Sequence, residues 1–320
     1  MDPLVTADDV AAAAQRVQGH VRRTPTIAGG ADELGLPIGV TLKLELLQHT
    51  GSFKPRGAFN RILTALESGD VPGVGLVAAS GGNHGAAVAY AAGRLGLHAD
   101  VFVPSTSPVN KRHRIAALGA DVYVIDGLYD DAQAAADERR HDTGALLVHP
   151  YEDRAIVAGQ GTMAVELDGQ LDGYDTLVVA AGGGGFVAGQ AAWIGHRRRV
   201  VSVEPETSRC LHAALEHGGP VTVDVAGLAA DSLGARRVGD VPWSIVGQFV
   251  DDAVLVSDRD IRSAQTTLWD AYRLVVEPGG AAALAGLRSG AYVPAPDERV
   301  VVVVCGSNCD PATVVEPLIR

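Results

Sequence analysis

Short apolar runs rich in β-branched residues alternate with longer alanine-rich segments along almost the whole chain. Each apolar run is bounded by Gly, Pro or Asp, which is typical of buried strands, and the longer segments have helical periodicity. The runs that predict strands are residues 74–79, 99–103, 121–125, 176–180, 200–203 and 300–304. The segments that predict helices are residues 85–95, 111–118, 130–140 and 155–167.

This alternation indicates an α/β fold with parallel sheets covered by helices on both faces, because strands buried on both sides are apolar throughout. Residues 218–249 show no regular pattern, and we assign them no structure. In doubly wound sheets, ligands bind beyond the carboxyl ends of the strands. The loops that follow predicted strands are therefore the first places to search for chemistry.

Composition and charge exclude several classes of function. The formal net charge of -12 argues against a nucleic-acid or anionic-membrane partner, since both require a basic face. The three cysteines are too few for a disulfide framework and fit a reducing compartment. No basic and apolar leader begins the sequence, and no apolar stretch is long enough to span a bilayer. We expect a cytoplasmic protein whose partner is a small molecule.

The first candidate loop contains Lys54, which follows a strand ending near Lys43 and a Thr-Gly-Ser turn. Ser52 is expected to cap a helix that starts near Phe53. A lysine in the first helical turn is electrostatically unfavourable, so its pKa should be lowered toward the neutral amine that condenses with an aldehyde. The alternative is an ordinary solvated lysine.

Two glycine-rich loops each follow a predicted strand. The first contains Ser80, Gly81, Asn83 and His84, and exposed amides at such a turn can hold a carboxylate or a phosphate. Helix capping is the alternative role of Asn83 and His84. The second loop has four successive glycines: Gly182, Gly183, Gly184 and Gly185. Because each glycine costs backbone entropy, this run indicates a cradle of amide donors for the phosphate of a cofactor. It lacks the spacing of nucleotide-binding loops.

Cys305 ends the last predicted strand, where a ligand-facing residue is expected. With Cys309 it forms half of a possible metal site, but the chain has no matching second pair. A buried free cysteine most often serves as a small apolar side chain.

Together these loops resemble the fold-type II pyridoxal-phosphate enzymes, specifically the serine/threonine dehydratase and serine racemase group. The resemblance runs nearly end to end, and its motifs occur in the family's order. They are Arg-Thr-Pro at 23–25, Leu-Gln-His-Thr-Gly-Ser-Phe-Lys-Pro-Arg-Gly-Ala at 47–58, Ser-Gly-Gly-Asn-His-Gly at 80–85, Ile-Val-Ala-Gly-Gln-Gly-Thr at 156–162, the glycines at 182–185, Val-Glu-Pro-Gly-Gly-Ala at 276–281, and Cys-Gly-Ser-Asn at 305–308.

The resemblance implies a role for each candidate residue. Lys54 would bind pyridoxal 5'-phosphate as a Schiff base and later act as the base, with Phe53 against the cofactor ring. Asn83 would donate to the phenolic oxygen of the ring, and residues 182–185 would hold the phosphate. The substrate carboxylate would be held by Ser80, Gly81, Asn83 and His84.

Cys305 would face the pyridine nitrogen of the cofactor. A neutral, weakly acidic partner does not keep that nitrogen protonated, so the ring is a poorer electron sink and loss of a β-leaving group is favoured. The resemblance therefore implies dehydration and deamination of L-threonine or L-serine to 2-oxobutanoate or pyruvate and ammonia. Two alternatives stay open: a serine racemase, or a dehydratase or lyase for another β-substituted amino acid, such as threo-3-hydroxyaspartate or an osmolyte-derived one. A third is a cofactor-binding protein without turnover.

Some positions depart from the pattern of this group. Gly81 occupies the position of the serine that racemases use as a second base, so racemisation is not expected. Glu204 matches a metal-binding glutamate of some relatives, but Cys210 replaces their aspartate, so no metal is expected. Because the sequence ends soon after Cys305, we expect no appended regulatory domain. By resemblance, a large cofactor domain (1–69 and 148–320) would carry a small mobile substrate-closing domain (70–147), and the enzyme would be a homodimer of the tryptophan synthase β type.

Overall fold

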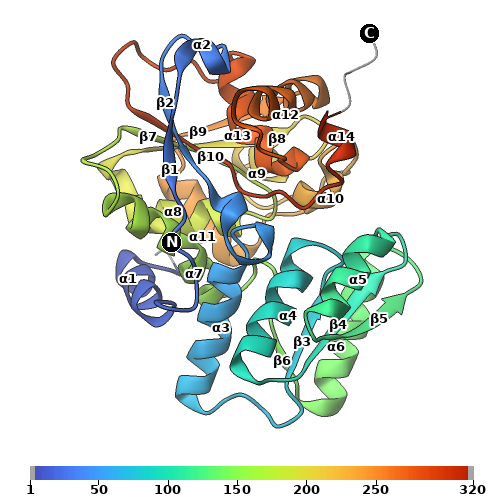
Figure 1. Ribbon diagram of the computed structural model, residues 1–320. Helices are drawn as coiled ribbons and strands as arrows, with labels where there is room; N and C mark the ends of the chain where they lie inside the picture. Colours follow the sequence, from blue (N-terminus) through green and yellow to red (C-terminus); the bar gives the residue numbers. More distant parts are fainter. Residues whose placement is uncertain (1–3, 316–320) are drawn as a thin grey trace.

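The computed structural model describes residues 4–315 and contains two β-sheets, each covered by helices (Figure 1). The larger sheet has six strands in the order β1-β2-β10-β7-β8-β9, and the smaller has four in the order β5-β4-β3-β6. All pairings are parallel except that of β1 with β2. The predicted α/β class with two parallel sheets is confirmed, and the antiparallel β1–β2 pair is an addition that the sequence pattern did not indicate.

The six predicted strands agree closely with β3, β4, β5, β7, β8 and β10, whereas β1, β6 and β9 were not predicted. The strands are β1 (Thr26–Gly29), β2 (Val40–Lys43), β3 (Leu76–Ala79), β4 (Ala99–Pro104), β5 (Asp121–Ile125), β6 (Leu146–Leu147), β7 (Thr176–Ala180), β8 (Arg199–Pro205), β9 (Asp252–Val256) and β10 (Val300–Val303). One expectation was wrong: β5 is not buried. It pairs only with β4 at the edge of the smaller sheet, and Tyr123 and Val124 are 40% and 49% exposed.

Helices follow most of the strands and begin near their carboxyl ends. They are α1 (Ala7–Arg16), α2 (Ala31–Leu34), α3 (Pro55–Ser68), α4 (Asn83–Leu95), α5 (Val109–Ala117), α6 (Tyr129–Thr143), α7 (Arg154–Asp168), α8 (Gly185–Ile194), α9 (Cys210–His217), α10 (Ala230–Leu233), α11 (Asp240–Phe249), α12 (Asp258–Tyr272), α13 (Pro278–Arg288) and α14 (Ala312–Val315), with 3-10 turns η1 (Glu45–Leu47), η2 (His49–Gly51) and η3 (Gly195–Arg197). The unassigned stretch 218–249 contains α10 and α11. Among residues 4–315, no helix is both long and apolar enough to cross a membrane.

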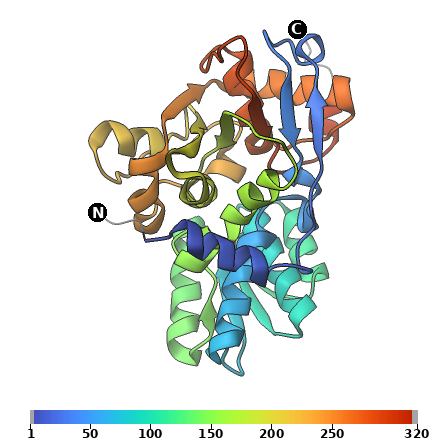
Figure 2. The same cartoon turned by 90° about the vertical axis from the view of Figure 1, so that its left-hand side faces the viewer.

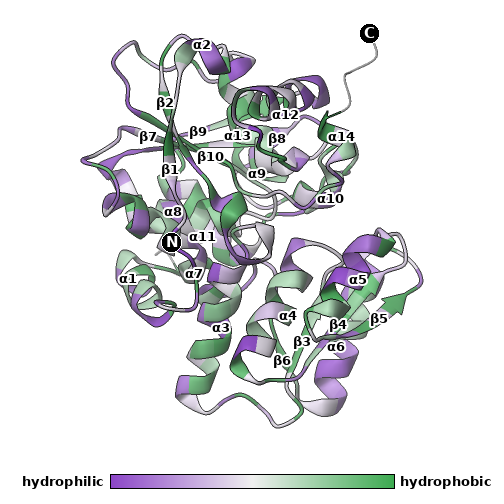
Figure 3. Ribbon diagram, in the orientation of Figure 1, coloured by the Kyte–Doolittle hydropathy of each residue, from purple (hydrophilic) through white to green (hydrophobic). Residues whose placement is uncertain are grey.

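The apolar core follows the two sheets. Figure 3 shows hydrophobic residues along the central strands of each sheet and polar residues on the outer turns of helices such as α6. Helices α7 and α8 approach so closely that a Cβ on Gly189 would lie 2.4 Å from Val157 O, so only glycine fits there. Helix α1 packs against α3, α7 and α8 and crosses the junction between the two halves of the molecule (Figure 2).

The strands of the smaller sheet lie within residues 76–147, inside the predicted insert 70–147. The division of the chain at residues 69 and 148 into two domains stays a prediction. The fold brings the candidate loops near one another, because the loops containing Lys54, Ser80, the four glycines and Cys305 all follow the carboxyl ends of parallel strands.

Candidate active site

The Lys54 segment is held against the end of β10. Phe53 N donates to Cys305 O at 3.3 Å, and Ser52 forms a backbone bridge with Gly306. The expected cap was wrong: the side chain of Ser52 does not cap α3, and Lys54 itself occupies the N-cap position before Pro55. The turn before it places Thr50 at φ 60°, a left-handed conformation that is strained for a β-branched residue.

The pKa of Lys54 is lowered, as the sequence predicts, but the cause is burial and not its place at the start of a helix. Burial lowers the pKa of its amine to about 8, although Cys305 and Glu277 oppose that shift. Its Nζ donates to the carbonyl oxygen of Pro150 at 3.0 Å. A substantial fraction of the amine is therefore neutral near pH 8, and the neutral form is the one that attacks an aldehyde.

The loop after β3 carries Ser80, Asn83 and His84. Ser80 Oγ accepts a hydrogen bond from Gly82 N at 3.2 Å, and Asn83 is the first residue of α4. Gly82 is the N-cap and no side chain caps this helix, so the capping alternative for Asn83 and His84 does not hold. Burial, with Lys54 nearby, lowers the pKa of His84 to about 3. The neutral imidazole donates from Nε2 to Val148 O at 2.7 Å, which leaves Nδ1 for another partner.

Gly81 lies against Ser107 of the neighbouring loop. A Cβ at Gly81 would be 1.8 Å from Ser107 Oγ, so a larger residue at this position requires Ser107 to move. The hydroxyl of Ser107 thus occupies the space in which a side chain of residue 81 would lie.

The four glycines form a tight cradle between β7 and α8. A Cβ at Gly183 or Gly185 would lie 2.5 or 2.8 Å from Tyr151, and Gly184 has φ 89° and contacts Pro242. The amides in the first turn of α8 have no intrahelical acceptor and carry the positive end of the helix dipole. This geometry suits a phosphate dianion, and the packing of Tyr151 explains why no side chain is tolerated at Gly183 and Gly185.

Phe53 and Cys305 complete the set of predicted site residues. The ring of Phe53 stacks on Phe186 with centroids 3.8 Å apart. Cys305 is 5% exposed, and burial raises the pKa of its thiol, so it stays protonated and donates to Gly279 O at 3.5 Å. A neutral group therefore lies at the end of β10.

Glu277 and Asn308 belong to the site, although the motif analysis gave them no role. Asn83 Nδ2 donates to Glu277 Oε1 at 2.6 Å, and Asn308 Nδ2 donates to Asn83 Oδ1 at 2.5 Å. Glu277 is 3% exposed, and burial raises its pKa to about 7. A glutamate that directly precedes Pro-Gly-Gly at a helix start was the sequence signal for it.

These features fit pyridoxal phosphate. The residues offer an amine of lowered pKa, a glycine cradle at a helix N-terminus, an amide donor and a neutral thiol. Two buried hydroxyls beside Lys54, Thr50 Oγ1 and Ser52 Oγ, have no hydrogen-bond partner among the described residues. Buried polar atoms without partners are uncommon and are typical of a binding site.

Glu204 and Cys210 lie beside the glycine cradle. The Glu204 carboxylate accepts from Leu211 N at 2.9 Å and His212 N at 2.7 Å, and burial raises its pKa to about 7. Cys210 Sγ donates to Gly182 O at 3.3 Å. Both side chains are therefore engaged with backbone groups of the loop and of α9.

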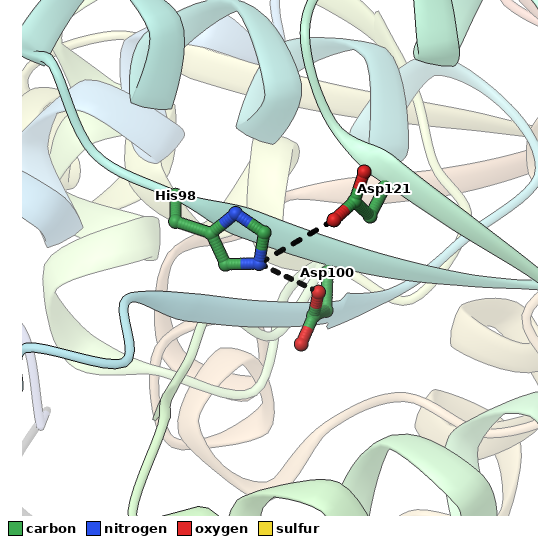
Figure 4. A group of neighbouring side chains, drawn as sticks. All are labelled: His98, Asp100 and Asp121. Carbon is green, nitrogen blue, oxygen red and sulfur yellow. Dashed lines mark hydrogen bonds and ion pairs between the residues drawn. The ribbon is translucent and has the colours of Figure 1, made fainter.

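Another group of ligand-type side chains, His98, Asp100 and Asp121, lies at the amino ends of β4 and β5 (Figure 4). His98 Nε2 is 2.8 Å from Asp100 Oδ1 and 3.8 Å from Asp121 Oδ2. The other oxygen of Asp100 accepts from Arg139 Nε at 2.8 Å. An arginine thus already balances the buried carboxylate, and the group joins β4 to α6.

Comparisons with known proteins agree with this geometry. The family described as "Pyridoxal-phosphate dependent enzyme" matches residues 17–306. The biosynthetic L-threonine dehydratase IlvA of Mycobacterium leprae is 38% identical over 320 residues, which cover 96% of this chain and 73% of that protein. Maize serine racemase superimposes with a TM-score of 0.89 at 30% identity, covering 96% of this chain and 94% of that one. The T.th. threonine deaminase gives a TM-score of 0.87 at 32% identity, with 95% and 99% covered.

The fold and the site together define a cofactor-dependent α/β enzyme built around a lysine of lowered pKa. The chain belongs to the pyridoxal-phosphate-dependent enzymes of fold type II, among relatives that include threonine dehydratases and serine racemases.

Proposed function

We propose that this enzyme catalyses the pyridoxal-phosphate-dependent β-elimination of L-threonine, L-serine or both, releasing 2-oxobutanoate or pyruvate and ammonia. The observation that carries the proposal is the buried, protonated thiol of Cys305 at the end of β10, near Lys54. Such a partner disfavours a long-lived carbanion and favours loss of a β-leaving group. Relatives at 38% and 32% identity are an L-threonine dehydratase and an L-threonine ammonia-lyase.

In this proposal each group of the chain has a defined task. When bound, the cofactor supplies an electron-withdrawing ring that acidifies the α-carbon of the substrate. Lys54 Nζ holds the cofactor and then accepts the α-proton, and the amides of residues 182–185 hold the phosphate. The side chain of Asn83 would donate to the phenolic oxygen of the cofactor. Ser80, Gly81, the backbone of Asn83 and His84 Nδ1 would orient the substrate carboxylate. The water lost with the β-hydroxyl is regained on hydrolysis, so the net products are a 2-oxo acid and ammonia.

The packing of Gly81 argues against a racemase. A serine at this position would collide with Ser107 Oγ, 1.8 Å from its Cβ. No side chain of residue 81 is thus available as a second base. We expect inversion of L-serine to be much slower than elimination.

A substrate panel tests the proposal. The purified enzyme with its cofactor is given L-threonine, L-serine, D-serine and threo-3-hydroxyaspartate, and the release of 2-oxo acid and of inverted amino acid is measured. We expect a visible absorbance band from the bound cofactor and rapid oxo-acid release from L-threonine or L-serine. A band without oxo acid from either of these two, or faster release from 3-hydroxyaspartate, would overturn it. Light scattering on the same sample tests the proposed homodimer.

A further inference from the structure

The side-chain amide of Asn83 is held from two sides. Its Nδ2 donates to Glu277 Oε1 at 2.6 Å, and its Oδ1 accepts from Asn308 Nδ2 at 2.5 Å. Asn83 begins α4 beside the smaller sheet, whereas Glu277 precedes α13 and Asn308 follows β10 of the larger sheet. The three side chains therefore meet across the junction between the two halves of the molecule.

The hydrogen-bonding pattern fixes which way each amide points. Asn308 Nδ2 also donates to the backbone oxygen of Thr50 at 2.8 Å, and that oxygen can only accept. Arg114 Nη1 donates to Asn308 Oδ1, and a guanidinium can only donate. The amide of Asn308 is thus oriented from both ends and must present an N–H to Asn83. Asn83 must in turn present its oxygen to Asn308 and its nitrogen to Glu277, whether or not Glu277 is protonated.

The surroundings of Glu277 consist of the backbone of Gly306 and several charged side chains. Its backbone N donates to Gly306 O at 3.1 Å, and a Cβ at Gly306 would lie 1.7 Å from its Oε1. Charges of both signs surround it: Lys111 and Arg114 of α5 and the amine of Lys54, opposed by Asp231 of α10. The absence of a side chain at Gly306 thus leaves the space in which the Glu277 carboxylate lies beside Asn83.

We propose that Glu277 and Asn308 are positioning residues that orient the amide of Asn83, so that its second N–H is directed at the phenolic oxygen of bound pyridoxal phosphate. This inference rests on the proposed function, in which Asn83 contacts the cofactor. An amide nitrogen has two hydrogens, and Glu277 takes only one of them. Without Glu277 and Asn308, the amide of Asn83 can also turn its oxygen toward the cofactor.

A double-mutant cycle on cofactor binding tests the proposal. The full chain is stripped of cofactor, and its affinity for pyridoxal phosphate and the absorbance maximum of the bound cofactor are measured for the wild type, Glu277→Gln, Asn83→Ala and the double variant. A hydrogen bond to a charged group corresponds to about a tenfold change in affinity or more. Glutamine lacks the charge and can also turn its own NH2 group toward Asn83, so we expect Glu277→Gln to weaken binding about tenfold and to shift the absorbance maximum. In the Asn83→Ala background, the same substitution should change the affinity less than about twofold.

Equal effects of Glu277→Gln in both backgrounds would show a general structural role and overturn the proposal, as would no effect in either. A second double-mutant cycle combines Asn308→Ala with Asn83→Ala. It tests the proposal by the same criterion if Glu277→Gln does not fold. Glu298→Gln is the matched control, because this carboxylate binds Thr176 and Tyr292 at the opposite ends of β7 and β10. It should leave the affinity within about twofold of the wild type. The titration does not depend on turnover, so an enzyme that binds cofactor normally but releases no oxo acid refutes the proposed function alone.

Discussion

Two groups of largely buried ionisable side chains include or adjoin the segment that carries Lys54, and they differ in how their charges are balanced. The first, which we term the closed ion network, consists of Lys43, Glu45, Arg56 and Glu166. Arg56 binds Glu45 through two hydrogen bonds of 2.7 Å and Glu166 through one of 2.9 Å, and Lys43 binds Glu166 at 2.5 Å. Burial would raise the pKa of Glu45, but Arg56 lowers it below its usual value.

The second, which we term the site group, consists of Lys54, His84, Glu277 and Cys305. Here burial prevails over charge pairing. It lowers the pKa of Lys54 to about 8 and that of His84 to about 3, and it raises that of Glu277 to about 7. The pKa of Cys305 also rises. Each group is shifted toward its neutral form.

The difference shows what each group contributes. In the closed ion network, Arg56 and Glu45 hold each other in their charged forms, although burial lowers the pKa of Lys43 there too. Arg56 lies in the first turn of α3, two residues after Lys54. In the site group, Lys54 and Glu277 have pKa values of about 8 and about 7, so they exchange protons near neutral pH, which is what acid–base chemistry requires. The network anchors the lysine, and the site group sets its reactivity.

Replacing Lys54 should abolish turnover without lowering stability, and this variant should distinguish the two groups most clearly. Lys54→Ala removes the amine that holds the cofactor and accepts the α-proton, so we expect turnover to fall by about 10⁴-fold or more. The closed ion network is untouched, and the midpoint of urea unfolding of the cofactor-free protein should stay close to that of the wild type. Oxo-acid release and circular dichroism measure the two quantities. Retained turnover would refute the role of Lys54.

Breaking the closed ion network should instead lower the free energy of unfolding. Glu45→Gln leaves Arg56 buried with one fewer carboxylate, and removing one partner of a buried pair costs about 3–5 kcal/mol. We expect that loss in the free energy of unfolding, measured with urea on the cofactor-free protein. The control is Glu67→Gln, whose carboxylate is largely exposed and binds Arg16 at 2.8 Å, and which should cost under about 1 kcal/mol. Equal losses in the two variants would contradict the comparison.

Titration of Lys54 gives a third test. In the cofactor-free protein its pKa of about 8 means that about 1% of the amine is neutral at pH 6 and about half at pH 8. The rate of covalent cofactor attachment should therefore rise about 50-fold between pH 6 and pH 8 and level off above pH 9. The visible absorbance after rapid mixing follows this rate. A rate that is flat over this range would mean that the amine is not the titrating group.

Part of the fold could be predicted from the sequence, and part of it could not. The apolar runs located the central strands to within a few residues, because strands buried on both faces are continuous in sequence. Strand β5 was misjudged because its composition is that of a central strand, whereas its exposure depends on which strand lies beside it. The β1–β2 pairing likewise depends on a long-range partner that local pattern does not specify.

The same distinction applies to the site. Lys54, the glycine cradle and Cys305 each follow a strand and have an unusual local pattern, so sequence alone indicated them. Ser52 was misassigned as a cap because the turn at Thr50 redirects its side chain. Glu277 and Asn308 act through contacts 194 and 225 residues away from Asn83 in the sequence, which no local motif encodes.

The smallest expected effect concerns Cys305. Two substitutions test whether the reaction depends on a neutral group at this position or on the sulfur atom itself. Cys305→Ser keeps a small neutral donor at the end of β10, so oxo-acid release should change by less than about fivefold. Cys305→Asp places a carboxylate in the same buried position, where it would pair with the pyridine nitrogen of the cofactor and stabilise the carbanion. We expect slower elimination and faster exchange of the α-proton with solvent deuterium in the aspartate variant, measured by NMR. If serine and aspartate variants behave alike, the neutrality of Cys305 does not direct the reaction, and the contrast between the two buried groups loses its link to elimination.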